Sequence, residues 1–147
     1  MTSQNINGMN LRRQKQGDVL MFDGQEYVGQ QVTERLAAWV ADDKQTAAMG
    51  KLPANAVVTN VRIQVTEAFN SDGTDLISVG YTGATTAFAT TTDVSSTGIK
   101  SVTLGSGVGF TATARDVNAY YANGGTEPTL GKALVILEYY RVPGQVA

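Results

Sequence analysis

Residues 57–66 constrain the fold most strongly, because apolar and polar side chains alternate there over ten residues. Side chains of a β-strand point alternately to opposite faces, so a period of two predicts a strand with one buried face. One face is predicted to carry Val57, Val61, Ile63 and Val65. The other is predicted to carry Val58, Asn60, Arg62, Gln64 and Thr66. The segment is therefore predicted to be a long, half-buried strand.

The segment 132–142 has a different pattern. Leu134 and Ile136 fall on one face of a strand, while Val135 and Leu137 fall on the other. A strand that is apolar on both faces is buried on both faces. We therefore expect a central strand here, ended by Pro143.

Further short strands are predicted between turn signals that recur about every 8–12 residues. They cover residues 76–82, the Thr-rich segment 85–97, residues 99–104, and residues 110–121 with a bend near Arg115-Asp116. Residues 19–28 are predicted to form a hairpin around Asp23-Gly24, a dipeptide that supplies the positive φ angles of a tight turn. Seven or eight such strands, without alternating long helices, predict an all-β fold, an antiparallel β-sandwich or jelly roll.

Residues 32–40 fit two patterns. Val32, Leu36, Trp39 and Val40 follow helical spacing, whereas Val32, Leu36, Ala38 and Val40 nearly alternate. Because alanines occupy the middle of the segment, we favour one short helix. Trp39 is then expected to be a packing anchor rather than a platform for a ligand.

Composition excludes several functions. The chain has no His and no Cys, which rules out Ser-His-Asp and Cys-His catalysis, His-ligated metals and disulfides. Its 147 residues suit one domain, and its net charge of −2 lacks the basic excess of a nucleic-acid-binding domain. No apolar run exceeds six residues, and the run Ala133 to Leu137 has five, far short of the ~20 that cross a membrane. We therefore expect no enzyme, no nucleic-acid partner and no membrane partner.

Residues 1–18 are predicted to form an extended N-terminal arm, and residues 19–147 a single β-sandwich domain. The arm is rich in Asn, Gln, Ser and Gly, and such a composition cannot bury enough apolar surface to fold by itself. We expect it to lie on a partner or back on its own domain. Its candidate partner-binding residues are two apolar anchors and a basic cluster: Met9, Leu11, Arg12, Arg13 and Lys15. The cluster is either a salt-bridging anchor or a solvated run of charges.

Two segments resemble ligand-binding loops without completing the motif. Residues 70–75 space carboxylates as a calcium loop does, but the distant Glu is missing. Residues 105–109 are glycine-rich, but no helix is expected after them, as a phosphate-binding loop requires. Both segments are typical of turns, and the adjacent Asp42 and Asp43 rarely converge on one site from a loop. No catalytic, cofactor or metal site is assigned.

Charged and aromatic residues within the strands are expected to serve packing and association. Arg62 and Arg115 lie among apolar residues and are interpreted as salt-bridge partners rather than anion ligands. One tyrosine of each pair, at 120–121 and at 139–140, is expected in the core because the two point to opposite faces. The other is a candidate for an interface, where tyrosine is enriched.

A resemblance to a known group is carried by six segments. They are LPANAVV (52–58), VTEAFNSDGT (65–74), VGY (79–81), FAT (88–90), DVSSTG (93–98) and GKALVILEY (131–139). In this pattern of turn and strand residues, about residues 50–142 resemble small virion structural proteins of tailed bacteriophages, often capsid decoration (cement) proteins with a jelly-roll or β-sandwich domain.

The resemblance implies a non-enzymatic protein on the outer surface of the capsid. It implies the major capsid protein as partner and a homo-oligomer, with a trimer favoured and a dimer possible. No binding residues carry over, because no contact motif is shared. Two alternatives stay open: a tail, fibre-base or head-tail connector protein of the virion, and a carbohydrate-binding module on the same scaffold.

Overall fold

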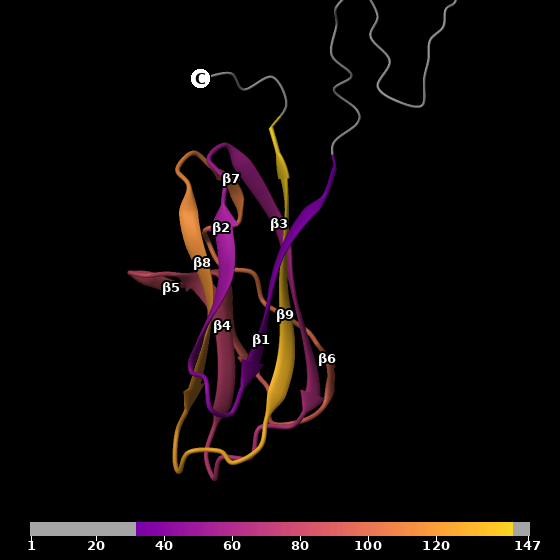
Figure 1. Cartoon of the computed structure of the whole chain (residues 1–147), viewed down its shortest axis with the longest axis vertical. Helices are drawn as coiled ribbons and strands as arrows, with labels where there is room; N and C mark the ends of the chain where they lie inside the picture. Colours follow the sequence, from indigo (N-terminus) through magenta and orange to yellow (C-terminus); the bar gives the residue numbers. More distant parts are fainter. Residues whose placement is uncertain (1–31, 143–147) are drawn as a thin grey trace, which may run out of the picture. The chain divides into compact units, whose positions relative to one another are not determined.

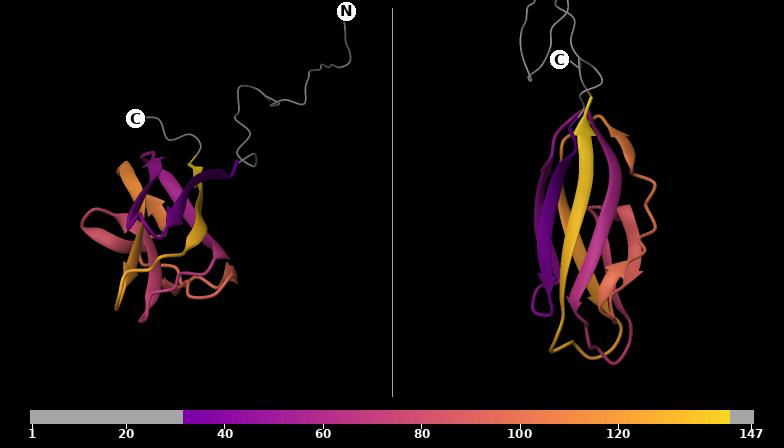
Figure 2. Two further views of the ribbon diagram at one scale, coloured as in Figure 1. Left: turned by 60° about the horizontal axis from the view of Figure 1, so that its bottom comes forward. Right: turned by 90° about the vertical axis from the view of Figure 1, so that its right-hand side faces the viewer.

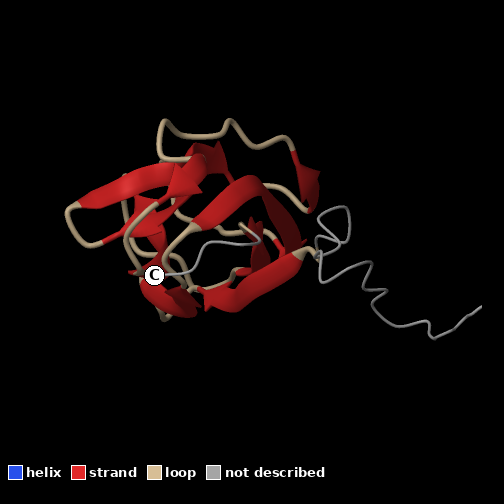
Figure 3. Ribbon diagram, turned by 90° about the horizontal axis from the view of Figure 1, so that it is seen from above, coloured by secondary structure: helices blue, strands red, loops and turns tan. Residues whose placement is uncertain are grey.

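The computed structural model describes residues 32–142, which form nine β-strands (Figure 1). The strands are β1 Glu34–Ala41, β2 Thr46–Leu52, β3 Ala56–Glu67, β4 Asp75–Tyr81, β5 Ala84–Asp93, β6 Gly98–Lys100, β7 Gly109–Thr111, β8 Arg115–Asn123 and β9 Lys132–Arg141. No helix occurs in this range (Figure 3), and none there is available to cross a membrane. The predicted arm 1–18 and the predicted hairpin 19–28 lie outside the described residues.

The strands form two sheets, and every pairing is antiparallel (Figure 2). One sheet has the order β1-β9-β3-β6, with β7 also pairing with β3. The other has the order β2-β8-β4-β5. Successive strands often belong to different sheets, as β1 and β2 do, so neither sheet is a simple series of hairpins. The prediction of an antiparallel β-sandwich is confirmed.

The core lies between the sheets and is made of aliphatic and aromatic side chains from both. Its largest fully buried members are Leu52, Ile63, Phe69, Ile77, Phe88 and Leu137. The predicted central position of the 132–142 segment is confirmed, because β9 pairs with β1 on one side and β3 on the other. The predicted burial of both its faces is wrong, because Leu134, Ile136 and Tyr140 point outward and are half-buried.

Strand β3 departs from the predicted two-face pattern at its start. The register with β9 shifts between Val58 and Asn60, which marks a β-bulge around Thr59. A bulge inserts one extra residue and changes the side-chain alternation on either side of it. Val58 is therefore buried and Val57 points outward, the reverse of the prediction, whereas residues 60–65 keep their predicted faces.

The helix predicted for residues 32–40 is wrong. Residues 34–41 form β1, which pairs residue for residue with β9 from Glu34↔Tyr139 to Ala41↔Lys132. Helix propensity is a weak preference that tertiary contacts override. Here the alternation of Leu36, Ala38 and Val40 decided the outcome, because it gives this edge strand an inward face.

The predicted strand 110–121 is two strands in different sheets. Residues 109–111 form β7 beside β3, and residues 115–123 form β8 between β2 and β4. The bend expected near Arg115-Asp116 is thus close to the place where the chain changes sheets. The strand predicted at 99–104 is also shorter, because β6 ends at Lys100.

Candidate interaction surface on the outer face of one sheet

The loop with calcium-like spacing uses its carboxylates in internal hydrogen bonds. Asp72 Oδ1 accepts a bond of 2.6 Å from the backbone N–H of Thr126. Asp75 Oδ1 accepts a 2.5 Å bond from the hydroxyl of Tyr121, and Asp75 is buried. Among residues 32–142, no group of three or more acidic side chains is arranged to hold a metal ion. The loop acts as a brace between β3, β4 and the segment after β8.

The glycine-rich segment 105–109 covers the edge of β5. The backbone N–H groups of Gly105 and Gly107 donate to the carbonyls of Phe88 and Ala87, at 3.0 and 2.7 Å. A Cβ atom on Gly105 would lie 2.3 Å from the carbonyl oxygen of Thr86, so this approach requires glycine. The segment closes a sheet edge that would otherwise expose unpaired backbone groups.

The largest concentration of exposed apolar side chains lies on the outside of the five-stranded sheet. We call this surface the outer β9 face. It consists of Arg35, Ala37 and Trp39 of β1, Val57, Asn60, Arg62 and Gln64 of β3, Ile99 of β6, Phe110 of β7, and Lys132, Leu134, Ile136, Glu138 and Tyr140 of β9. These residues alternate with the buried residues of the same strands and therefore share one face.

Two rows of mainly apolar side chains, called the apolar rows below, cross this face. In the first, Trp39 lies opposite Leu134, Leu134 opposite Gln64, and Gln64 opposite Ile99, so the row spans four strands. In the second, Tyr140 lies opposite Val57, and Val57 opposite Phe110. Trp39 is 49% exposed, Ile99 80% and Phe110 56%.

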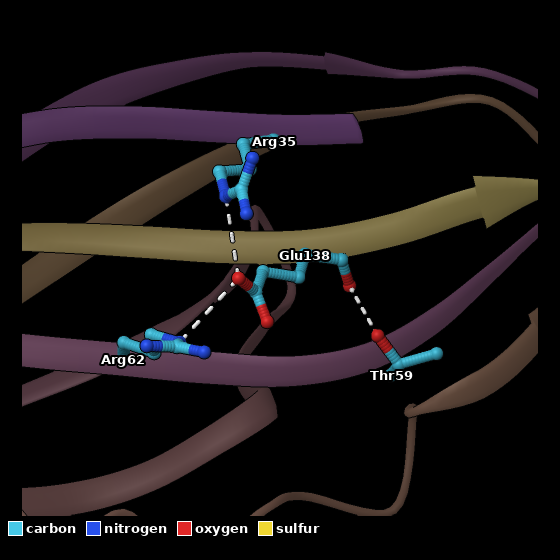
Figure 4. Close-up of polar contacts among 4 residues, drawn as sticks. All are labelled: Arg35, Thr59, Arg62 and Glu138. Atoms are coloured by element: carbon cyan, nitrogen blue, oxygen red, sulfur yellow. Dashed lines mark hydrogen bonds and ion pairs between the residues drawn. The ribbon is translucent and has the colours of Figure 1, made fainter. Parts of the chain in front are cut away.

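A shielded carboxylate lies between the two rows. Glu138 Oε2 is 3.3 Å from Arg35 Nε and 3.4 Å from Arg62 Nε, one arginine from each flanking strand (Figure 4). The carbonyl oxygen of Glu138 also accepts a bond from the hydroxyl of Thr59. The Glu138 side chain is 10% exposed, whereas those of Arg35 and Arg62 are 59% and 61% exposed. The Glu138 carboxylate is thus paired with the two arginines and shielded from solvent, while both guanidinium groups are exposed on the outer face.

A second polar cluster lies at one end of β9, among residues that alternate with those of the outer β9 face. Arg141 Nε lies 2.9 Å from Glu34 Oε2, and Glu34 Oε1 also accepts a bond from the Tyr139 hydroxyl. Burial, followed by the bond to Glu34, raises the pKa of Tyr139. The hydrogen bond from Tyr139 to Glu34 ties β9 to the start of β1.

The prediction that Trp39 is a packing anchor is wrong, because its ring faces outward and is about half exposed. Lys132 Nζ lies 5.0 Å from the centre of the Trp39 ring, a cation–π contact. The helix interpretation had given Trp39 a place beside Val40, but in a strand adjacent residues point to opposite faces. Because the segment is a strand and Val40 points inward, Trp39 points outward.

The outer face of the second sheet is different. Its outward residues include Thr46 and Ala48 of β2, half-buried Leu76 of β4, and Asn118, Tyr120 and Ala122 of β8, whereas Ser78 and Gly80 of β4 are buried. They are mostly small or polar. Of the six large apolar residues that are exposed within 32–142, none lies on β2, β4, β5 or β8. The two outer faces of one sandwich thus differ in chemistry.

The other predictions for charged and aromatic residues have mixed outcomes. Arg62 pairs with Glu138, as expected, but Arg115 stacks over the Tyr81 ring, with its Cζ 4.3 Å from the ring centre. Tyr121 and Tyr139 are buried, which confirms that one tyrosine of each pair lies in the core. The predicted partner-binding residues Met9, Leu11, Arg12, Arg13 and Lys15 lie outside the described residues.

Comparisons with known proteins identify similar folds in two phage capsids. No protein-family model and no curated protein sequence matches the chain. The fold is similar to that of a chain in the cyanophage Pam1 capsid asymmetric unit, with a TM-score of 0.61 and 20% identity, over 96% of this chain and 99% of that one. It is also similar to that of a chain in the acidic stable capsid structure of Helicobacter pylori bacteriophage KHP30, with a TM-score of 0.52 and 17% identity, over 74% of this chain and 87% of that one.

Proposed function

We propose that this protein is a structural component of a phage virion, and that it decorates the head. In this role it binds the outer surface of the shell, contacts the major capsid protein and stabilises the assembled particle. The observation that carries the proposal is the similarity of fold to chains of two phage capsids. The sequence resemblance to decoration proteins points in the same direction.

The match to the cyanophage chain extends over nearly the whole of both chains. The alignment covers 96% of this chain and 99% of the other, so the two chains have nearly the same length. A chain of this size and fold is thus part of a capsid asymmetric unit in that phage. Here it would act as an independent unit added to the shell, as a trimer or a dimer.

The chemistry of the chain fits binding better than catalysis. With no His and no Cys, acid–base work would fall to carboxylates, lysines and tyrosines. Asp72, Asp75 and Glu138 are each engaged in internal bonds. A sandwich with one apolar outer face is instead suited to association with another protein.

Co-sedimentation with DNA-free, expanded capsid shells from the same source tests the proposal. We expect saturable binding at a fixed ratio to the major capsid subunit, and that ratio would identify the symmetry axis occupied. Unexpanded shells serve as the comparison. If the folded protein fails to bind expanded shells, the decoration role is wrong, and binding to isolated tails or connectors would favour the alternative virion role.

The exposed Trp39 is the one observation that favours the carbohydrate-binding alternative, because indole rings stack on sugars. Lys132 occupies the vicinity of that ring, which argues against a free stacking platform. A glycan array with the wild-type protein and Trp39→Ala distinguishes the two roles. Binding that is lost in the variant would support a carbohydrate module.

A further inference from the structure

We infer that the outer β9 face is the surface that contacts the shell, and that it fits a partner surface with an apolar centre and carboxylates beside it. The inference rests on the proposed decoration role and deepens it. It names which side of the sandwich is used and what chemistry the partner presents.

The first argument is the uneven distribution of exposed apolar side chains. Trp39, Ile99 and Phe110 lie on three different strands of one sheet, yet all three point to the same side. Half-buried Leu134 and Tyr140 fill the spaces between them along β9. Burying such a surface against a partner is favourable in proportion to the apolar area removed from water.

The second argument comes from the opposite side of the same molecule, which serves as an internal comparison. Its outward residues are mostly small or polar, and its tyrosine, Tyr120, bonds to Asn118 within the same strand. A fold that only needed a solvated exterior would show this chemistry on both sides. The apolar side is therefore the one suited to protein contact.

The third argument is charge, which identifies the occupant. The face carries Arg35, Arg62 and Lys132 against the one carboxylate of Glu138, and the exposed Glu67, which lies opposite Lys132, adjoins its end. Glu138 is nearly inaccessible, and the Glu67 carboxylate accepts a bond from the Gly131 N–H. The charges on this face that a partner can reach are therefore mainly positive, although the whole chain has a net charge of −2.

This charge pattern argues against a second copy packed on the same face. Two such faces brought together across a two-fold axis would place the exposed guanidinium groups and Lys132 in one desolvated layer. Like charges juxtaposed at an interface cost several kcal/mol. A different protein surface with carboxylates opposite Arg35 and Arg62 has no such cost, because it can form charge-assisted hydrogen bonds.

The test compares substitutions on the two outer faces in the shell co-sedimentation assay. Ile99→Glu and Phe110→Glu each place a carboxylate on the apolar rows at an exposed position, so folding should be preserved. Ala48→Glu introduces the same charge on the opposite face and is the matched control. Arg62→Gln removes one outward cation while Arg35 still pairs with Glu138. Thermal melts of all four variants check that each is folded.

We expect each glutamate variant of the outer β9 face to weaken shell binding about tenfold or more, as loss of an interface anchor does, with Ala48→Glu unchanged. Arg62→Gln should weaken binding less and should flatten its dependence on salt, because it removes one charge pair. If wild-type protein binds but the face variants bind equally well, the inference is wrong and the decoration role stands. If wild-type protein does not bind, the proposed function itself fails.

Two further outcomes would overturn the inference. Sedimentation velocity of the free proteins shows whether Ile99→Glu dissociates an oligomer, in which case the face is an interface between copies. Loss of glycan binding in the same variant would assign the face to a carbohydrate. Unchanged free oligomers together with lost shell binding support the inference.

Discussion

Replacing Tyr121 by Phe should destabilise the sandwich through one missing hydroxyl group. Tyr121 is buried, and its hydroxyl donates a 2.5 Å hydrogen bond to Asp75 Oδ1. Asp75 is itself buried, and its other bond to that oxygen, from the backbone N–H of Ser71, is long at 3.4 Å. The ring stacks on Phe69 at 4.7 Å between centres, a contact that phenylalanine keeps. The substitution thus isolates the hydrogen bond from the packing.

The expected loss of stability follows from the Asp75 carboxylate, which loses its hydroxyl donor in the variant. A hydrogen bond to a charged group contributes about 1.5–3 kcal/mol, and leaving a buried acceptor unsatisfied costs a similar amount. We expect Tyr121→Phe to lower the free energy of unfolding by about 2 kcal/mol, or the Tm by roughly 8 °C for a domain of this size.

Urea unfolding followed by circular dichroism measures the effect, and an unchanged m-value shows that the two-state comparison is valid. Tyr120→Phe is the matched control. Its hydroxyl accepts a bond from Asn118 at a half-exposed position, so it should cost less than about 0.5 kcal/mol. A double-mutant cycle with Asp75→Asn isolates the pair. Equal effects of the two tyrosine substitutions would refute the reasoning.

Three further predictions concern packing, pH and the arm. Gly131→Ala should cost several kcal/mol in unfolding experiments, because φ is +151° and a Cβ atom would lie 2.3 Å from the buried ring of Phe69. The pKa values of Tyr121 and Tyr139 are both raised, chiefly by burial. Their unfolded forms ionise first, so stability should hold below about pH 10 and fall above it; pH-dependent melts should show a shallower fall in Tyr121→Phe. Deleting residues 1–18 should leave the melting curve of the sandwich intact but weaken shell binding, and unchanged binding would contradict a contact role for the arm.

Much of the fold was predictable because strand signals in the sequence are local. The alternation in residues 60–65 and the apolar character of both faces of β9 identified a half-buried and a central strand correctly. The sequence pattern could not show the bulge near Thr59, because a bulge depends on the hydrogen-bonding partner as well as on the chain. Because of this bulge, Val58 points inward and Val57 outward, the reverse of the predicted faces.

The candidate surface was harder to predict than the strands that carry it. Trp39, Leu134 and Ile99 are far apart in the sequence and meet only through the register of β1, β9, β3 and β6. Because residues 32–40 were predicted to be a helix, Trp39 was not expected to lie in a sheet. An alternation of Leu36, Ala38 and Val40 was present as a signal, but alanine-rich segments favour helix in isolation. Pairing with β9 outweighs that preference.

The outer β9 face is small for a complete protein–protein interface. Residues 132–140 of β9 extend about 26 Å, and the axes of four strands span about 14 Å. The resulting area, on the order of 400 Å², is about half of what one partner buries in a standard interface. If the protein decorates a shell, we expect a second contact to add to the area that this face buries.

We propose residues 1–18 as this second contact, and its independence from the outer β9 face can be measured. If residues 1–18 bind the shell separately from the face, their deletion and Ile99→Glu should change the binding free energy additively, within about 0.5 kcal/mol. If the arm instead folds back over its own outer β9 face, deletion uncovers that face, and the two changes interact by more than this amount. The combined variant in the co-sedimentation assay separates these cases. Additive losses would assign the arm to the shell, since only contacts that share no partner surface contribute independently.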